Sequence, residues 1–505
     1  MTQRLKVKPL ILSIFMISIC SIVYELIIAG ISTYLLGNSI MQFSITIGLY
    51  MSAMGLGSYL SRFCKNHLFD TFAGIELGIG MIGGISGILL FAAYAYTNIY
   101  VFVMYVVIII IGILVGLEIP LLTRIVEDYN QDLRVTLANV LSFDYLGGLL
   151  GSVLFPLLLF PHLGFIRTSF LIGVINVLVA GIMIRYYGDF LEKKKHFFLL
   201  FWICTVVLAG GFMTGQYSAD QIEQSLYRDQ IVYSKQTPYQ KIVLTKHRDD
   251  LRLFLDGNIQ FSSMDEYRYH EALIHPIMSL AHQKENILIL GGGDGLAVRE
   301  LLKYSQVKKI DLVDIDRDMV NLCKENSLVV GINQGALSNE KVALHFEDAY
   351  KYLENSKSKY DVVIVDLPDP NNESLNNLYT NTFYRLIGNH LKSKGLMVVQ
   401  STSPYYAKEA FWCVNKTIQR ENFQVKPYHI QVPSFGEWGF QLASKESFDI
   451  NNITLNVPTQ FLQKENILAM FAFAKDEKVD MEKIEPNCIS RPILLRYYQK
   501  AEERF

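Results

Sequence analysis

Acidic residues follow two runs of aliphatic side chains, where they could bind a cation or accept a proton. One run is followed by the glycine-rich turn Gly291-Gly-Gly-Asp-Gly295, which places Asp294 inside the turn itself. The other run ends in Asp366, and Asp369 follows within the same short segment. A carboxylate inside a ligand-binding turn opposes a phosphate and attracts positive charge. We therefore expect a positively charged small-molecule ligand.

The glycine-rich turn lies between a predicted strand and a predicted helix. Residues 287–290 are typical of a buried parallel strand, and the residues after the turn have the apolar spacing of a helix. Gly291, Gly293 and Gly295 would let the backbone approach a ligand closely. Leu296 stands where a dinucleotide-binding turn needs its third glycine, so NAD is a poor fit. The pattern favours a nucleoside-sulfonium ligand of the S-adenosylmethionine (AdoMet) type.

Two further strands would bring carboxylates to the same edge of a sheet. Residues 310–316 are typical of the second strand of such a fold, and Asp314 stands near its carboxyl end, where a ribose diol is usually held. Residues 360–366 are typical of another buried strand, which would place Asp366 at the ligand crevice of a doubly wound sheet. The sequence thus predicts an α/β nucleoside-binding fold with Asp294 and these two carboxylates around one ligand.

The stretch before the glycine-rich turn has a different pattern. Residues 230–262 alternate between apolar and polar side chains in short runs, with Asp249-Asp250 and Asp256-Gly257 at the reversals. This pattern predicts a small antiparallel sheet. Residues 265–275 then predict a helix, because they begin with two acids that suit a helix amino terminus.

Composition indicates a membrane-embedded part. Of the 505 residues, 51% are hydrophobic, the mean hydropathy is +0.24, and long apolar runs fill the chain up to residue 215. A formal net charge of -2 gives no case for nucleic-acid binding. The six cysteines are scattered singly, without metal-ligand spacing, so we expect reduced thiols and no structural zinc.

Hydropathy predicts about seven membrane-spanning helices in the apolar region. Their expected ranges are 9–30, 39–61, 72–96, 99–122, 137–160, 166–186 and 196–215. Basic residues fall on alternate connections, beginning with Arg4, Lys6 and Lys8, which favours a cytoplasmic amino terminus. An odd number of spans would put the polar half outside the cell, whereas an AdoMet-type donor is supplied in the cytoplasm. Either one apolar run is re-entrant or the chemistry faces outward.

Several motifs occur together in the order found in one enzyme family. They are Asp256-Gly-Asn-Ile-Gln260, Asp265-Glu266 with Tyr269-His270-Glu271, Gly291-Gly-Gly-Asp-Gly295, Asp314-Ile-Asp316 and Asp366-Leu-Pro-Asp-Pro370. Over residues 230–445 the sequence resembles the spermidine synthases, or polyamine aminopropyltransferases. The segments Tyr24-Glu25, Gly116-Leu-Glu-Ile-Pro120 and Leu494-Leu-Arg-Tyr-Tyr498 are similar to those of the multi-span membrane members of that family in bacteria.

The resemblance implies several domains. We expect a multi-span α-helical membrane domain over residues 1–216, a small antiparallel β-sheet domain over 217–265, a Rossmann-like doubly wound catalytic domain of the AdoMet-methyltransferase type over 266–450, and a C-terminal helical tail over 451–505. The implied partners are the lipid bilayer, an amine substrate and a second copy of the chain in a homodimer, with no nucleic acid. The implied location is the bacterial inner membrane, which the chain would cross several times.

The implied reaction moves the aminopropyl group of decarboxylated AdoMet to putrescine, giving spermidine and 5'-methylthioadenosine, without a metal or prosthetic group. Asp366 is expected to act as base and to position the amine, with the Tyr269 hydroxyl as its hydrogen-bonding partner. The residues expected to bind decarboxylated AdoMet are Gln240, Gln260, His270, Gly291, Gly293, Asp294, Gly295, Asp314, Asp348 and Ala349. Those expected to bind the amine are Asp369, Gln400 and Phe435.

Some features leave the substrate and the role of the apolar half open. Phe435 stands where the family usually has a tyrosine whose hydroxyl contacts the acceptor, so spermidine or another amine is an alternative to putrescine. The polar residues 371–377 are a candidate lid over the amine. The same fold could instead use intact AdoMet to methylate a small amine.

A third interpretation makes the helical bundle a carrier or sensor of polyamines with a fused synthase-like domain. It is suggested by four acids within or at the ends of the predicted spans, where a carboxylate is costly unless it is paired, hydrated or protonated. These acids are Glu25, Glu76, Glu118 and Asp144. They would form either helix-packing contacts or a cation path.

Overall fold

The structure, a computed structural model, describes residues 7–36, 39–130 and 133–502. Arg4 and Lys6, on which the predicted orientation partly depends, lie outside these residues. The chain divides into two compact units, a helical unit (Met1–Arg228) and an α/β unit (Asp229–Phe505).

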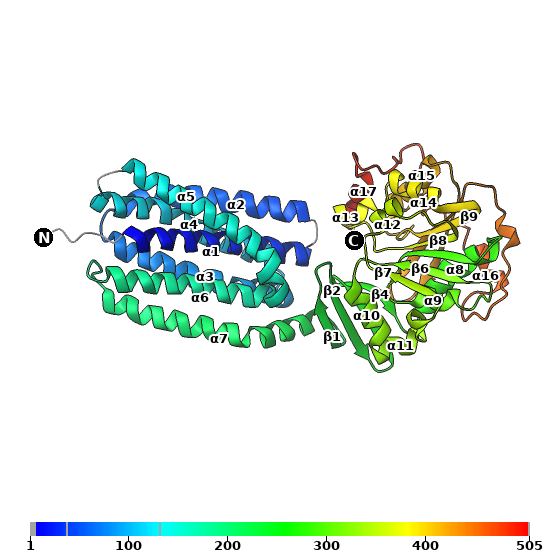
Figure 1. Cartoon of the computed structure of the whole chain (residues 1–505), viewed down its shortest axis with the longest axis horizontal. Helices are drawn as coiled ribbons and strands as arrows, with labels where there is room; N and C mark the ends of the chain where they lie inside the picture. Colours follow the sequence, from blue (N-terminus) through cyan, green and yellow to red (C-terminus); the bar gives the residue numbers. More distant parts are fainter. Residues whose placement is uncertain (1–6, 37–38, 131–132, 503–505) are drawn as a thin grey trace. The chain divides into compact units, whose positions relative to one another are not determined.

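The helical unit is a bundle of long helices whose order follows the predicted spans. Its helices are α1 (Val7–Leu36), α2 (Ser39–Leu60), α3 (Leu68–Tyr96), α4 (Tyr100–Asn130), α5 (Leu133–Leu154), α6 (Phe160–Tyr187) and α7 (Lys194–Leu226). Six continuous helical stretches of the described residues are long and apolar enough to cross a membrane, and one of them, Leu137–Tyr187, contains most of α5 and all of α6. Gly164 breaks that stretch, because its φ of 67° is not helical. In Figure 1, α1 begins at one end of the bundle and α7 ends at the other.

The α/β unit contains two sheets, as predicted. The first is antiparallel, in the order β1-β2-β3-β4, with strands β1 (Gln230–Gln236), β2 (Lys241–His247), β3 (Asp250–Leu255) and β4 (Asn258–Ser262). The second has seven strands in the order β10-β11-β9-β8-β5-β6-β7. These strands are β5 (Asn286–Gly291), β6 (Lys309–Val313), β7 (Val342–His345), β8 (Tyr360–Asp366), β9 (Leu391–Gln400), β10 (Gln424–Val432) and β11 (Gly436–Ser444). Strands β5 to β9 are parallel, and β11 pairs antiparallel with both β9 and β10.

Helices cover both faces of the seven-stranded sheet (Figure 1). They are α8 (Glu266–Leu280), α9 (Leu296–Leu301), α10 (Arg317–Glu325), α11 (Ser327–Asn333), α12 (Ala349–Asn355), α13 (Glu373–Asn377), α14 (Asn381–His390) and α15 (Lys408–Arg420). Side chains of β5 alternate between two apolar cores: Ile287 and Ile289 face one, and Leu288 and Leu290 face the other. Burial on both faces explains why this strand is a continuous aliphatic run. The predicted Rossmann-like doubly wound sheet is therefore present.

The C-terminal segment differs from the predicted helical tail. Between residues 450 and 502, the described part of this segment, the helical elements are α16 (Lys464–Ala469), α17 (Ile493–Glu502) and a short 3-10 turn. The carboxylate of Glu271 accepts hydrogen bonds from the backbone N–H groups of residues 460–462, which fixes part of this segment against α8. The segment wraps the α/β unit by such specific contacts, which a hydrophobic pattern does not reveal.

Candidate active site

Close contacts explain the glycines of the turn after β5. A Cβ atom on Gly291 would lie 2.1 Å from the carbonyl oxygen of Asp366 on β8, and one on Gly293 would lie 2.5 Å from Oδ2 of Asp314. Gly295 has a φ of 79°, a conformation that glycine adopts without strain, and it is the N-cap residue of α9. From the sequence, we expected these glycines to let the backbone approach a ligand. In the structure they also let Asp314 and Asp366 come close to the turn.

Asp294 lies inside the turn, and each oxygen of its carboxylate contacts a different neighbour. Its Oδ1 accepts a hydrogen bond of 2.9 Å from the backbone N–H of Leu296, which stabilises the start of α9. Its Oδ2 lies 3.9 Å from Nε2 of His270. The side-chain amide of Asn333 donates to its carbonyl oxygen at 2.9 Å. Asp294 is thus held from both its backbone and its side chain.

The Tyr269 side chain, from the first turn of α8, reaches the end of β8. Its hydroxyl donates a 2.6 Å hydrogen bond to Oδ1 of Asp366. Burial and the negative charge of Asp294 raise the pKa of Asp366 to about 6, although His270 and Tyr269 act in the opposite direction. Burial and the Asp366 charge keep the pKa of Tyr269 well above its usual value. At neutral pH the pair is a phenol donor and a carboxylate acceptor, as the sequence predicted.

His270, which the sequence predicted to bind the donor, is buried and carries a positive charge at neutral pH because its pKa is raised. Burial opposes its charge, but the hydrogen bond with Glu266 and the negative charges of Asp294 and Asp366 raise its pKa to about 9. Its Nδ1 lies 2.9 Å from Oε2 of Glu266, and Arg299 donates to both oxygens of the same carboxylate at 2.7 and 3.0 Å. The imidazolium therefore offsets one of the negative charges beside the turn.

Asp314 lies beside the glycine-rich turn, and the nearby Asp316 contacts residues of the small sheet's first reversal. Burial raises the pKa of Asp314 to about 6, and its Oδ1 accepts a 2.9 Å hydrogen bond from the backbone N–H of Asp316. Asp316 in turn accepts hydrogen bonds from Thr237 at 2.8 Å and from the side chain of Gln240 at 2.9 Å. The Gln240 amide, predicted to contact the donor, thus joins the small sheet to the loop after β6.

A second group of polar side chains surrounds Asp369. The amide of Gln400 donates to Oδ1 of Asp369 at 3.2 Å and to the carbonyl oxygen of Leu367 at 2.5 Å. The Tyr498 hydroxyl donates to Oδ2 of Asp369 at 3.1 Å, and the indole of Trp438 donates to Oε1 of Gln400 at 3.1 Å. Burial raises the pKa of Asp369 to about 6 despite these hydrogen bonds. The structure therefore brings together Asp369 and Gln400, two residues that the sequence predicted to bind the amine.

Aromatic rings contact side chains of both groups. The ring of Phe435 lies edge-on to Tyr269 at 6.1 Å between centroids and edge-on to Trp438 at 5.1 Å. The preceding residue, Ser434, donates to both carboxylate oxygens of Asp265 at 2.6 and 2.8 Å, which ties this loop to the start of α8. Phe435 thus presents an apolar ring at the position where the family usually has a tyrosine hydroxyl.

Three predicted residues are not part of this network of contacts. Gln260 donates to the carbonyl of Asn258 at 3.2 Å, and Asp348 caps α12 by accepting from the N–H of Lys351 at 3.0 Å. Ala349 is buried at the start of α12. Among the described residues, no hydrogen bond joins these three to another candidate side chain. Their predicted contacts with the donor remain predictions.

Sequence reasoning assigned no role to Tyr498, Trp438, Glu266 or Arg299. The segment that contains Tyr498 was noted only for its resemblance, and Glu266 only as part of a motif. No local pattern relates α17 to the loop after β8, so the Tyr498 contact could not be found without the fold. The predicted lid, residues 371–377, contains the short helix α13. The carbonyl oxygen of Asn376 in this helix accepts a hydrogen bond from the Asn487 side chain at 3.3 Å.

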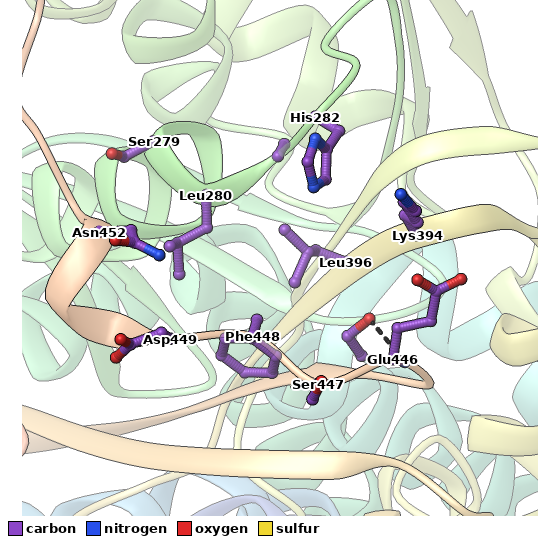
Figure 2. Close-up of a pocket in the computed structure, with 12 residues that line it drawn as sticks. Ser279, Leu280, His282, Lys394, Leu396, Glu446, Ser447, Phe448, Asp449 and Asn452 are labelled. Atoms are coloured by element: carbon purple, nitrogen blue, oxygen red, sulfur yellow. Dashed lines mark hydrogen bonds between the residues drawn. The ribbon is translucent and has the colours of Figure 1, made fainter.

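A pocket of about 760 Å³ lies away from these residues (Figure 2). Its lining includes Ser279 at the end of α8, Lys394 near the start of β9, and Glu446, Phe448 and Asp449 after β11. Gln400 ends β9, so the pocket and the candidate site lie at opposite ends of this strand. None of the residues that line it is a candidate site residue.

One cluster in the described part of the chain has the residue types of a metal site. It consists of His429, Glu437 and Glu477, whose ligand atoms lie within 4.8 Å of one another. Both nitrogens of His429 are already engaged, with Glu437 at 2.5 Å and with the carbonyl of Ala472 at 2.9 Å. These contacts within the fold explain the arrangement.

Comparison with known proteins agrees with the predicted resemblance. Residues 266–456 match the family model described as spermine/spermidine synthase domain. A polyamine aminopropyltransferase of Oceanobacillus iheyensis is 42% identical over 97% of this chain and 96% of that protein, and one from Leptospira interrogans is 39% identical over 98% and 99%. Polyamine aminopropyltransferase 2 of Ralstonia nicotianae is 41% identical over 97% of each chain.

Solved structures were also matched. A spermidine synthase in complex with the transition-state analogue AdoDATO is 25% identical, with a TM-score of 0.44, over 48% of this chain and 84% of that one. The spermidine synthase of Thermotoga maritima is 26% identical, with a TM-score of 0.45, over the same shares. The sequence matches extend over nearly the whole chain and define a transferase. The chain belongs to the family of polyamine aminopropyltransferases.

Proposed function

We propose that the protein transfers the aminopropyl group of decarboxylated AdoMet to putrescine, with spermidine and 5'-methylthioadenosine as products. The observation that carries this assignment is the position of Asp294 and Asp366 beside one glycine-rich turn, with the Tyr269 hydroxyl 2.6 Å from Asp366. Two carboxylates and one buried imidazolium leave net negative charge there. Such a site favours a donor that carries a sulfonium and an ammonium but no carboxylate.

The reaction is a displacement at carbon. The amine nitrogen attacks the methylene group beside the sulfonium, the carbon–sulfur bond breaks, and its electron pair returns to sulfur in methylthioadenosine. The attacking nitrogen becomes the secondary ammonium of spermidine. A protonated amine has no lone pair, so a group must accept its proton near the reacting carbon. Asp366 is suited to this role, because a pKa of about 6 leaves it ionised at neutral pH but more basic than an exposed aspartate.

The remaining candidate residues would position the two substrates. Asp314 would accept hydrogen bonds from the ribose, and Asp294 would bind the donor's ammonium together with Asp366. Asp369 and Gln400 would hold the distal ammonium of putrescine, while Phe435 contacts its methylene groups. An apolar wall between two acidic ends suits a diamine. Spermidine as acceptor would need room for a longer chain beyond Asp369.

The test uses the purified full-length protein with decarboxylated AdoMet and a panel of amines, with methylthioadenosine release as readout. We expect putrescine to be the preferred acceptor and Asp366→Asn to reduce turnover by about 10³-fold or more. Methyl transfer from intact AdoMet at an equal or greater rate would instead support the methyltransferase alternative. Light scattering of the same sample would test the expected homodimer.

We further propose that α1 to α7 cross the bacterial inner membrane and contact its lipids. The six long apolar helical stretches support this. Reporter fusions after Arg228 would test membrane insertion and orientation. A fluorescent reporter is active in the cytoplasm, whereas a phosphatase is active outside it. The two reporters therefore give opposite signals for the two orientations. A fusion protein found wholly in the soluble fraction would exclude membrane insertion.

A further inference from the structure

Four polar side chains from four helices come together inside the helical unit. They are Tyr24 on α1, Glu76 on α3, Glu118 on α4 and Asn176 on α6, and each is at most 2% exposed. The amide of Asn176 donates to Oε2 of Glu76 and to its carbonyl oxygen, both at 3.1 Å. The carboxyl groups of Glu76 and Glu118 lie within hydrogen-bonding reach of each other.

Tyr24 belongs to the same cluster. A Cβ atom on Gly83, two turns after Glu76 on α3, would lie 2.4 Å from Cζ of Tyr24, the carbon that carries the hydroxyl. The hydroxyl also interacts electrostatically with Glu76 and Glu118. Glycine at position 83 thus leaves room for the phenol beside α3.

Each of the four side chains keeps a buried polar atom without a hydrogen-bond partner. These atoms are the Tyr24 hydroxyl, Oε1 of Glu76, Oε1 of Glu118 and Oδ1 of Asn176. Three of them are acceptors only. A buried polar group without a hydrogen-bond partner is destabilising, and a charged one more so. Four such atoms in one place indicate a ligand that is positively charged.

No basic side chain of the described residues satisfies this need. The ion pairs of the helical unit join other residues, His67 with Glu192 and Lys194 with Asp189. Arg124, on the same helix as Glu118, donates instead to the carbonyl oxygens of Ser61 and Cys64. Because none of the described basic side chains reaches the cluster, a cation bound there would come from solution.

The number and type of the free atoms narrow the choice of ligand. Two ionised carboxylates in contact repel each other strongly, so the pair either shares a proton or binds a cation. A shared proton would satisfy the two carboxyls and leave Oδ1 of Asn176 without a donor. A metal cation bound by oxygen would satisfy all three acceptors, and carboxylate and amide oxygens are ligands that hard cations prefer.

We propose that Tyr24, Glu76, Glu118 and Asn176 form a binding site for one small alkali-metal cation between α1, α3, α4 and α6. The site is separate from the transfer reaction and lies wholly within the helical unit. Intramembrane carboxylates that meet in this way commonly mark ion pathways or ion-dependent conformational elements. The proposal holds whether or not the aminopropyl acceptor is putrescine.

The test measures binding of radioactive ²²Na⁺ to the purified full-length protein in detergent, by scintillation proximity at mildly alkaline pH. We expect saturable binding that unlabelled Na⁺ displaces. Glu118→Gln and Asn176→Ala should each weaken it by about tenfold or more, since each removes a direct ligand. Asn176→Ala changes no charge, so it separates lost ligation from altered electrostatics. Glu25→Gln, an acid on α1 outside the cluster, is the matched control and should bind like the wild type.

Gel filtration and far-UV circular dichroism establish that each variant is folded before its binding is compared. Absence of saturable ²²Na⁺ binding to the folded wild-type protein would overturn the proposal, and a shared proton would then explain the carboxyl pair. Equal binding by the wild type and both ligand variants would overturn it as well. Displacement of Na⁺ by putrescine at far lower concentration than by Li⁺ or K⁺ would assign the site to an ammonium group and reject the alkali-metal assignment.

Discussion

The Tyr269 hydroxyl donates a 2.6 Å hydrogen bond to Oδ1 of Asp366, which joins the first turn of α8 to the end of β8. The bond has two effects on the carboxylate. It orients Asp366 toward the glycine-rich turn, and it lowers the pKa of Asp366 against the opposing effect of burial. Tyr269 should therefore influence both the rate of transfer and its pH dependence.

Tyr269→Phe tests this relationship. We expect kcat to fall about 10–100-fold, because the base loses its orientation, and the acidic limb of the pH profile to move to higher pH. Methylthioadenosine release measured across pH gives both quantities. Tyr304→Phe is the control: its hydroxyl is hydrogen-bonded to His275 at 2.9 Å, so its loss should change neither. Equal effects of the two substitutions would indicate a structural role for Tyr269.

The raised pKa of Asp366 predicts the acidic limit of activity. The pKa rises from 3.8 to about 6 in the free protein, so the ionised base is lost as pH falls through about 6. We expect kcat/KM for the donor to decline below that pH. A bound sulfonium and ammonium stabilise the carboxylate, so the decline in kcat should occur at lower pH than that in kcat/KM. Profiles of the two parameters with coincident midpoints would contradict this account of the donor's charge.

Asp294 should determine which sulfonium the enzyme accepts. Two like charges about 4 Å apart cost several kcal/mol at an effective dielectric near 20, which disfavours the carboxylate of intact AdoMet beside Asp294. Asp294→Asn keeps an oxygen that can accept from the Leu296 N–H, so α9 should remain capped. We expect the KM for decarboxylated AdoMet to rise about tenfold or more and inhibition by intact AdoMet to become stronger.

The control for Asp294→Asn is Asp361→Asn. Asp361 is buried at the other end of β8, where it accepts from Lys392 and from the backbone of residues 285–286. Its substitution should lower stability without altering the choice between the two sulfonium compounds. Unchanged selectivity in Asp294→Asn would remove the electrostatic argument for the donor.

The sequence predicted those parts of the site that local patterns determine. The aliphatic run of β5, the glycine-rich turn and the acid at the end of β8 each have a signal within a few residues, and together they located Asp294, Asp314 and Asp366. The antiparallel sheet was likewise predicted from alternation. These features depend on backbone conformation and on burial of neighbouring side chains.

The features that the sequence did not predict depend on contacts between distant segments. The charge of His270 requires Glu266 on its own helix, but also Asp294 and Asp366, which only the fold brings near it. Gln240 contacts Asp316, 76 positions away in the chain. The irregular C-terminal segment is fixed by Glu271 through backbone hydrogen bonds, which have no side-chain pattern.

Tyr498 provides the clearest test of such a distant contact. Its hydroxyl donates to Oδ2 of Asp369 at 3.1 Å and lowers the pKa of that carboxyl, so its loss should leave Asp369 less ionised near pH 6 and less well oriented. We expect Tyr498→Phe to raise the KM for putrescine about tenfold while the KM for the donor stays constant, since a hydrogen bond to a charged group is worth about 1.5–3 kcal/mol. Tyr497→Phe is the matched control, because that hydroxyl accepts from the N–H of Glu485 instead. If both substitutions raised both KM values, α17 would support the fold as a whole and Tyr498 would have no particular role in holding the amine.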